Sequence, residues 1–249
     1  MGGFFGAAFE KDCIDSLFFG TDYHCHLGTR RGGMATVDES GFTRFIKDIT
    51  NAQFRSKFES DVLKLKGNMG IGIISDYEDQ PLLINSHLGS YAIATVGVVT
   101  NADELARNAF KKRAHFSEMI GNEINATELV ATLINQEDTF VAGIKNAQEM
   151  IEGSCSILLL TKDGIYAARD RLGRTPVVIG KCPEGYVVTM ETCAFPNLHC
   201  DTKKELGPGE VVFMTPDGIE RKSPPGPHMQ ICSFLWIYYG YPASSYQGI

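Results

Sequence analysis

Between residues 153 and 223 the sequence repeats one pattern that strongly limits the possible folds. Three times, two short runs rich in Val, Ile and Leu flank a glycine-containing turn, with the turn sequences DG at 163–164, PEG at 183–185 and DG at 217–218. Asp-Gly between apolar runs is one of the strongest local signals for a β-hairpin. This part of the chain therefore favours antiparallel sheet.

The N-terminal half adds further strands. Between the first two of them, Ile14, Leu17, Phe18 and Thr21 recur at helical spacing, which predicts a helix packed on a sheet. The predicted strands are short apolar and β-branched runs bounded by turn residues, at 3–8, 34–38, 42–46, 69–75, 82–85 and 91–99.

Helical periodicity dominates the middle of the chain, at residues 102–113, 128–136 and 139–153. Each of these segments begins beside an Asn or Thr residue that can cap it, and the last one ends at Gly153. This order of predicted elements, with strands first, helices next and hairpins last, is typical of an α+β fold. We expect a sandwich of two mostly antiparallel sheets covered by helices.

The balance of charge excludes several kinds of partner. The 249-residue chain has 30 acidic and 23 basic residues, which gives a formal net charge of −7, and the two signs are interspersed. Such a chain is not expected to bind nucleic acid or anionic membranes. The sequence contains no apolar run that could span a bilayer and no signal-peptide pattern, so we expect a cytoplasmic protein.

The seven cysteines show no CxxC spacing, and we expect reduced, half-buried thiols. The sequence His24-Cys25-His26 raises the possibility of a metal site. However, neighbouring side chains point to different sides of a helix, and no second ligand pair follows at zinc-finger spacing. A structural role is the favoured interpretation, and we expect neither a metal nor a cofactor.

Five segments, in chain order, carry a resemblance to a known family. They read GNMGIGI at 67–73, TNADEL at 100–105, RDRLGRTPVVIGK at 169–181, LGPGEVVFM at 206–214 and ICSFLWIYYGYPASSYQGI at 231–249. Together they resemble class II glutamine amidotransferase domains, and within that family the N-terminal half of the amidophosphoribosyltransferases. The resemblance covers nearly the whole sequence.

The resemblance implies a four-layer αββα sandwich of the N-terminal nucleophile hydrolase type. Members of the family cleave glutamine to glutamate and ammonia, and a second domain uses the ammonia to displace pyrophosphate from phosphoribosyl pyrophosphate in purine synthesis. Their first residue supplies both a thiol nucleophile and its own α-amino group as the base.

The residues that would perform this chemistry are replaced. The family's nucleophilic cysteine corresponds to Gly2, which has no side chain to activate. The asparagine that completes the family's oxyanion hole corresponds to Val96, although the adjoining glycine is kept as Gly97. Loss of one such hydrogen-bond donor typically lowers the rate by roughly 10²–10³.

The substrate-binding positions differ as well. The arginine that would bind the α-carboxylate of glutamine corresponds to Ser75, and the aspartate that would bind its ammonium group corresponds to Ala126. The family's QHRG motif aligns without a gap on CHLG, which places Leu27 at its arginine; a placement that uses Arg31 and Gly32 requires an insertion. We therefore expect a pseudo-glutaminase, with no catalytic residue and no binding or turnover of glutamine.

Cys13 is an alternative nucleophile if processing makes it the first residue. The segment that follows it, CIDSLFF, predicts a helix and not the family's first strand. This disfavours the alternative.

We expect residues 1–228 to form the amidotransferase-like domain and residues 229–249 to form a tail. In the family this tail leads into a phosphoribosyltransferase domain, which has no counterpart in this sequence. The resemblance implies such a domain as a partner in cis or in trans, and a homo-oligomer is also compatible with it. The tail aromatics either form an apolar surface for a partner or belong to the core: Phe234, Trp236, Tyr238, Tyr239 and Tyr241.

Two functions of different class remain open. One is a non-catalytic scaffold or regulatory domain, and the other is a small-molecule binding module that uses the remodelled glutamine pocket. A working hydrolase with altered chemistry would need a nucleophile that the sequence does not reveal. The segment 169–176 is predicted to form a buried, ion-paired turn and not an anion site built from Arg169, Asp170, Arg171 and Arg174.

Overall fold

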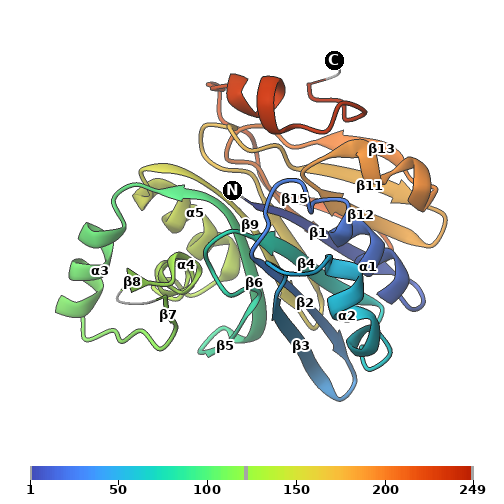
Figure 1. Ribbon diagram of the computed structural model, residues 1–249. Coiled ribbons are helices and arrows are strands. Elements are labelled where there is room, and N and C mark those ends of the chain that lie inside the picture. The colour runs from blue at the N-terminus through green and yellow to red at the C-terminus, as the bar shows by residue number, and fades with distance from the viewer. Residues whose placement is uncertain (1, 121–122, 248–249) are drawn as a thin grey trace.

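The computed structural model describes residues 2–120 and 123–247. Two antiparallel sheets stack against each other, and helices cover both outer faces (Figure 1). This is the predicted α+β fold, with the four αββα layers that the resemblance implies, and the expected fold class is confirmed.

The first sheet has the strand order β13-β11-β12-β1-β4-β2-β3, and the second has the order β15-β14-β10-β9-β6-β5. The first contains β1 (Gly2–Phe9), β2 (Arg31–Asp38), β3 (Gly41–Asp48), β4 (Met69–Ser75), β11 (Val178–Cys182), β12 (Gly185–Thr189) and β13 (Asp201–Glu205). The second contains β5 (Leu82–Ser86), β6 (Gly89–Val99), β9 (Gly153–Thr161), β10 (Gly164–Ala168), β14 (Val211–Met214) and β15 (Ile219–Ser223). A separate short pair is formed by β7 (Met119–Ile120) and β8 (Glu123–Ile124).

Five α-helices lie in the described part of the chain, and none of them is long and apolar enough to cross a membrane. They are α1 (Ile14–Asp22), α2 (Phe54–Val62), α3 (Ala102–Lys111), α4 (Ala126–Ile134) and α5 (Phe140–Met150). Shorter helical segments are η1 (Thr192–Ala194), η2 (Pro196–Leu198) and the π-helix η3 (Leu235–Tyr239).

Three apolar clusters join the layers. Phe4 and Leu158 belong to the cluster between the two sheets, whereas Phe5 packs with Leu17 under α1 and α2. Phe4 and Phe5 point to opposite faces because side chains alternate along a strand. The third cluster, which includes Ile157, lies beneath the helices of the second sheet.

The predicted strands and helices are all present, with small differences at their ends. The three turns each connect an antiparallel pair, β9–β10, β11–β12 and β14–β15, as predicted. Helix α2 and the strands β7, β8 and β13 were not predicted. In α2 only Phe54 and Phe58 supply buried apolar side chains, so the apolar pattern is weak.

Helix caps explain where α4 and α5 begin. The side chain of Asn125 accepts a hydrogen bond from the amide of Thr127 at 2.9 Å, and the hydroxyl of Thr139 accepts one from the amide of Ala142 at 3.2 Å. Each bond satisfies an amide that has no partner inside the helix.

The expectation that all cysteines are reduced is wrong for two of them. Cys182 and Cys200 form a disulfide, with Cα atoms 4.2 Å apart. Their neighbours Lys181 and Asp201 pair in the β11–β13 ladder, so the sheet itself brings the two thiols together. The other five cysteines are free. Cysteine spacing could not indicate this pair, because it depends on the strand register.

Candidate functional site

The first predicted site residue, Gly2, begins β1 in the middle of the first sheet. It pairs with Ser75 of β4, and Ser75 pairs on its other side with Arg31 of β2. A Cβ atom added at Gly2 would lie 2.5 Å from the carbonyl oxygen of Ile74, much closer than real Cβ atoms approach backbone. A cysteine at this position therefore requires the β1 and β4 backbones to move apart.

Val96 and Gly97 lie next to each other on β6, in the second sheet. Val96 is 8% exposed and belongs to the same inter-sheet cluster as Phe4. Gly97 has a φ of +151°, and a Cβ there would lie 1.8 Å from the carbonyl oxygen of Ser154. The position therefore demands glycine for its backbone, whatever its chemical role.

Ser75 is buried and engaged in a local turn. Its hydroxyl donates to Oε2 of Glu78 at 3.1 Å and accepts hydrogen bonds from the amides of Tyr77 and Glu78, each at 3.2 Å. A hydroxyl that caps a turn in this way has little capacity left for a ligand. The turn also places the Glu78 carboxylate beside the end of β4, a feature that sequence reasoning missed.

The segment after Ser75 is fixed to both sheets and to α4. The buried amide of Gln80 makes two hydrogen bonds with the backbone of Thr95 on β6, at 2.7 and 3.2 Å. Asn125 donates to the carbonyl of Asp79 at 3.2 Å, and the Asp79 carboxylate lies 2.9 Å from Nε of Arg31. Residues 75–80 therefore connect the end of β4 to β6 and to the start of α4.

Ala126 and Leu27 complete the predicted positions. Ala126 is the first residue of α4, directly after the cap Asn125, and presents only a methyl group. Leu27 is 2% exposed, and its Cδ1 would lie 2.8 Å from a Cβ added at Gly3. The six predicted positions thus fall at the ends of β1 and β4, on β6, at the start of α4 and in the α1–β2 connection.

The two histidines of the His24-Cys25-His26 sequence contact different parts of the chain. Nδ1 of His24 lies 2.9 Å from the carbonyl of Gly20, and its Nε2 lies 3.0 Å from the hydroxyl of Thr189. Burial lowers the pKa of His24 to about 4, although Glu191 opposes the shift. Nε2 of His26 lies 2.7 Å from the carboxylate of Glu191. Within residues 2–120 and 123–247 no group of metal-ligating side chains converges.

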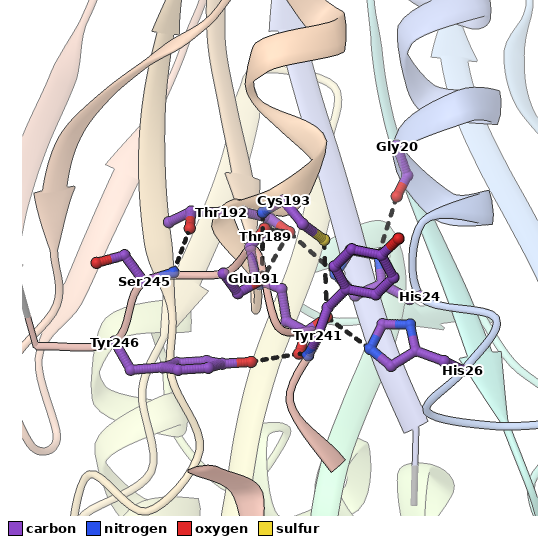
Figure 2. Close-up of polar contacts among 11 residues, drawn as sticks. Gly20, His24, His26, Thr189, Glu191, Thr192, Cys193, Tyr241, Ser245 and Tyr246 are labelled. Carbon is purple, nitrogen blue, oxygen red and sulfur yellow. Dashed lines mark hydrogen bonds and ion pairs between the residues drawn. The ribbon is translucent and has the colours of Figure 1, made fainter. Parts of the chain in front are cut away.

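Glu191 is a buried carboxylate that holds the C-terminal segment (Figure 2). It accepts hydrogen bonds from the hydroxyl of Tyr246 and, at 3.0 Å, from the amide of Tyr241. Burial alone would raise the pKa of Glu191, but the hydrogen bonds from His26, Tyr246 and Tyr241 hold it below its usual value. Sequence reasoning did not single out this residue, because its partners lie far away in the chain.

None of the four buried or half-buried free thiols outside the tail is activated. Burial raises the pKa of Cys155 to about 12, of Cys25 to about 12 and of Cys193 to about 11, with nearby carboxylates adding to each rise. Burial likewise raises the pKa of Cys13, which lies directly before α1. A nucleophilic cysteine needs a lowered pKa, and these thiols are protonated near neutral pH.

The segment 169–176 is a buried turn, as predicted. Arg169 is 3% exposed and donates to the carbonyl oxygens of Gly173 and Thr175, and it lies 3.6 Å from the Glu205 carboxylate. The Asp170 carboxylate accepts three backbone amides of the same turn. Arg169 and Asp170 are thus engaged within the turn, whereas Arg174 donates to Oε1 of Gln230 at 2.7 Å and Arg171 is exposed.

Among the tail aromatics singled out from the sequence, Phe234, Tyr238 and Tyr241 are exposed and Tyr239 is half-buried. Leu235 and Tyr246, in the same segment, are buried. The ring centroids of Phe234 and Tyr238 are 5.2 Å apart. The side chain of Trp236 and residues 248–249 lie outside the described residues.

A family model described as a glutamine amidotransferase domain matches residues 68–196 of the chain. The amidophosphoribosyltransferase of Methanocaldococcus jannaschii is 27% identical, over 100% of this chain and 58% of that protein. That of Bacillus subtilis is 28% identical, over 99% of this chain and 53% of that protein. The chain spans about half the length of these curated relatives.

Solved structures agree with the sequence comparison. The structure of the allosteric regulatory enzyme of purine biosynthesis has a TM-score of 0.88 and 27% identity, and the match covers 100% of this chain and 54% of that one. Glutamine phosphoribosylpyrophosphate amidotransferase from B. subtilis has a TM-score of 0.87 and 27% identity, with 100% and 55% covered.

Proposed function

Because the chain belongs to the glutamine amidotransferase domain family, we propose that it is a degenerate member of it. In this proposal it is the glutaminase-like domain of an amidophosphoribosyltransferase-like protein in purine biosynthesis. It does not hydrolyse glutamine, and it serves as a scaffold or regulatory domain.

The contact between Ser75 and Glu78 carries the proposal. A glutaminase must bind the α-carboxylate of its substrate, and arginine does so with two parallel hydrogen bonds. Here the corresponding residue is a serine whose hydroxyl is bonded to a carboxylate. A substrate carboxylate at this place would face Glu78, and two like charges repel each other in a half-buried environment.

The positions of the nucleophile and the oxyanion hole support the same conclusion. Gly2 offers no thiol, and the close approach of the Ile74 carbonyl leaves no room for one in this backbone arrangement. Val96 offers no hydrogen-bond donor where the family has a side-chain amide. Ala126 cannot pair with an ammonium group, so each part of the reaction lacks its partner.

We further propose that residues 229–249 are the connection to a phosphoribosyltransferase domain, with residues 1–228 as the domain itself. The exposed side chains of Phe234, Ile237 and Tyr238 form an apolar surface of the kind that a neighbouring domain covers. A domain in cis agrees with the length of the relatives. A partner in trans and a homo-oligomer remain alternatives to this arrangement.

The second candidate function, a binding module in the remodelled glutamine pocket, has less support. Ser75 and Glu78 bond to each other, and the side-chain amide of Gln80 bonds to the backbone of Thr95 on β6, so these polar groups are already in use. Of the two cavities described in the structure, neither is lined by Gly2, Ser75, Val96 or Ala126.

The proposal is tested by measuring ammonia and glutamate released from glutamine by the purified chain, beside an active class II glutaminase domain as the positive control. We expect no release above the uncatalysed background. Release at a rate similar to that of the control would overturn the proposal.

A further inference from the structure

A cavity of about 410 Å³ lies at the edge of the sandwich, on strand β3. This volume falls within the range of roughly 300–1,000 Å³ that is typical of small-molecule sites. Its walls include charged side chains of both signs from four parts of the chain: Arg31, Arg44, Asp48, Asp79 and Glu118.

The strand register shows which face of the sheet this cavity occupies. Arg44 pairs with Ala35, and Ala35 belongs to the cluster between the two sheets. Side chains directly opposite each other lie on the same face, and those two residues apart on one strand share a face. Arg44, Ile46 and Asp48 therefore lie on the inner side of β3, the edge strand of the first sheet.

Most of the charges at this cavity are already paired. Arg31 lies 2.5 Å from the Asp48 carboxylate and 2.9 Å from that of Asp79. Within residues 2–120 and 123–247, by contrast, Arg44 has no carboxylate within ion-pair distance, and Glu118 has no basic group. One positive and one negative group are thus left for a ligand.

Both of these residues are held in place. A guanidinium N–H of Arg44 donates to the carbonyl of Pro81 at 3.2 Å, which leaves its other N–H groups for further hydrogen bonds. The amide of Glu118 donates to the carboxylate of Glu128 on α4 at 2.8 Å, and its carbonyl accepts from the amide of Asn125. Arg44 is thus held through its side chain and Glu118 through its backbone.

We propose that this cavity binds a small zwitterion of the amino-acid class. The ligand carboxylate pairs with Arg44, and its ammonium group pairs with Glu118. The apolar side chain of Ile46 lies in the same wall and contacts the ligand between its charged ends. An arginine suits a carboxylate because its planar N–H groups match the two oxygens.

Gly2, Leu27, Ser75, Val96 and Ala126 do not line this cavity. Arg31, which pairs with Ser75 in the sheet, does line it, so the cavity lies next to the expected glutamine positions and does not include them. The proposal does not depend on the loss of glutaminase activity. The two ideas are distinguished by their readouts, since ammonia release reports on one and reversible binding reports on the other.

The test is a calorimetric titration of the whole chain with each of the common free L-amino acids. For any that binds, its α-amide and its N-acetyl derivative are titrated in parallel, because each lacks one of the two charges. We expect saturable binding of at least one amino acid, and binding at least about tenfold weaker for both derivatives.

Two variants locate the site on the protein. Arg44→Met and Glu118→Gln are each expected to weaken binding at least about tenfold, which corresponds to the loss of one charged contact. Lys203→Met and Glu149→Gln make the same charge changes on exposed residues elsewhere and are expected to leave binding unchanged. No saturable binding up to about 10 mM, or binding that either cavity variant leaves unaltered, would overturn the proposal.

Discussion

Ser75 donates its hydroxyl proton to the carboxylate of Glu78 across 3.1 Å, at the position that we expect to correspond to a substrate-binding arginine. The same hydroxyl accepts two backbone amides, so it is the centre of the turn that starts residues 75–80. In our proposal, a position expected to bind substrate is thus taken up by a turn of the chain itself.

Replacing Ser75 by alanine should destabilise this turn. The variant leaves two amides and one carboxylate oxygen without their partner, which costs about 1–3 kcal/mol of unfolding free energy for buried groups. Urea denaturation measures the effect. Ser60→Ala on the exposed side of α2 serves as the control and should change stability by less than about 0.5 kcal/mol. Equal effects of the two variants would contradict the role of Ser75.

The stability of the protein should fall as the pH falls from about 6.5 to about 4. The folded pKa of His24 is about 4, below its ordinary value of 6.5, so between these values the unfolded chain binds a proton that the folded chain does not. The stabilisation is complete above the unfolded pKa and declines as the pH falls toward the folded one, by on the order of 3 kcal/mol.

Denaturation curves at several pH values check this expectation. In His24→Gln the pH dependence over this interval should become shallower, whereas His228→Gln, which alters an exposed histidine, should retain it. An unchanged slope in His24→Gln would exclude His24 as its source.

The bond from Tyr246 to Glu191 should control how firmly the C-terminal segment is attached. In Tyr246→Phe the buried carboxylate loses a donor, at a cost of about 1.5–3 kcal/mol. Hydrogen exchange at the Tyr241 amide, which donates to the same carboxylate, should become faster. Tyr238→Phe is the control, because it removes an equivalent hydroxyl from a residue that is 71% exposed. If it accelerates exchange at the Tyr241 amide as much as Tyr246→Phe does, Glu191 is not the residue that anchors the C-terminal segment.

Unfolding the protein without a reductant should expose five reactive thiols, and with a reductant all seven. Thiol titration distinguishes the two counts. The Cys182–Cys200 disulfide joins residues 18 apart, and a loop of this size stabilises by about 3 kcal/mol. The double variant Cys182→Ala/Cys200→Ala should lose that stability. A count of seven thiols in the unaltered chain without reductant would show that the disulfide does not form.

Sequence patterns predicted the layers of the fold because each hairpin carries its own local signal. Gly164 and Gly185, for example, occupy turn positions with φ of +157° that favour glycine, next to strands of apolar residues. Helix α2 gave no such signal, because its burial rests mainly on two phenylalanines.

The positions of the candidate site were chosen from the sequence, but the contacts among them could not be predicted from it. Resemblance placed Gly2, Ser75, Val96 and Ala126, which are read directly from aligned motifs. The contacts of Glu78, Gln80 and Glu191 depend on a turn geometry and on partners far away in the sequence, such as His26 for Glu191. Such contacts follow from the three-dimensional arrangement and leave no periodic pattern in the chain.

The central claim is that the loss of glutaminase activity extends beyond the nucleophile. Release of ammonia from glutamine by the Gly2→Cys variant, beside the unaltered chain, tests it most directly. We predict that both remain at background, because Ser75, Val96 and Ala126 still lack the groups that bind and polarise the substrate. Turnover by Gly2→Cys at a rate similar to that of an active glutaminase domain would contradict the account, and Gly2 would then be a single change in a working site.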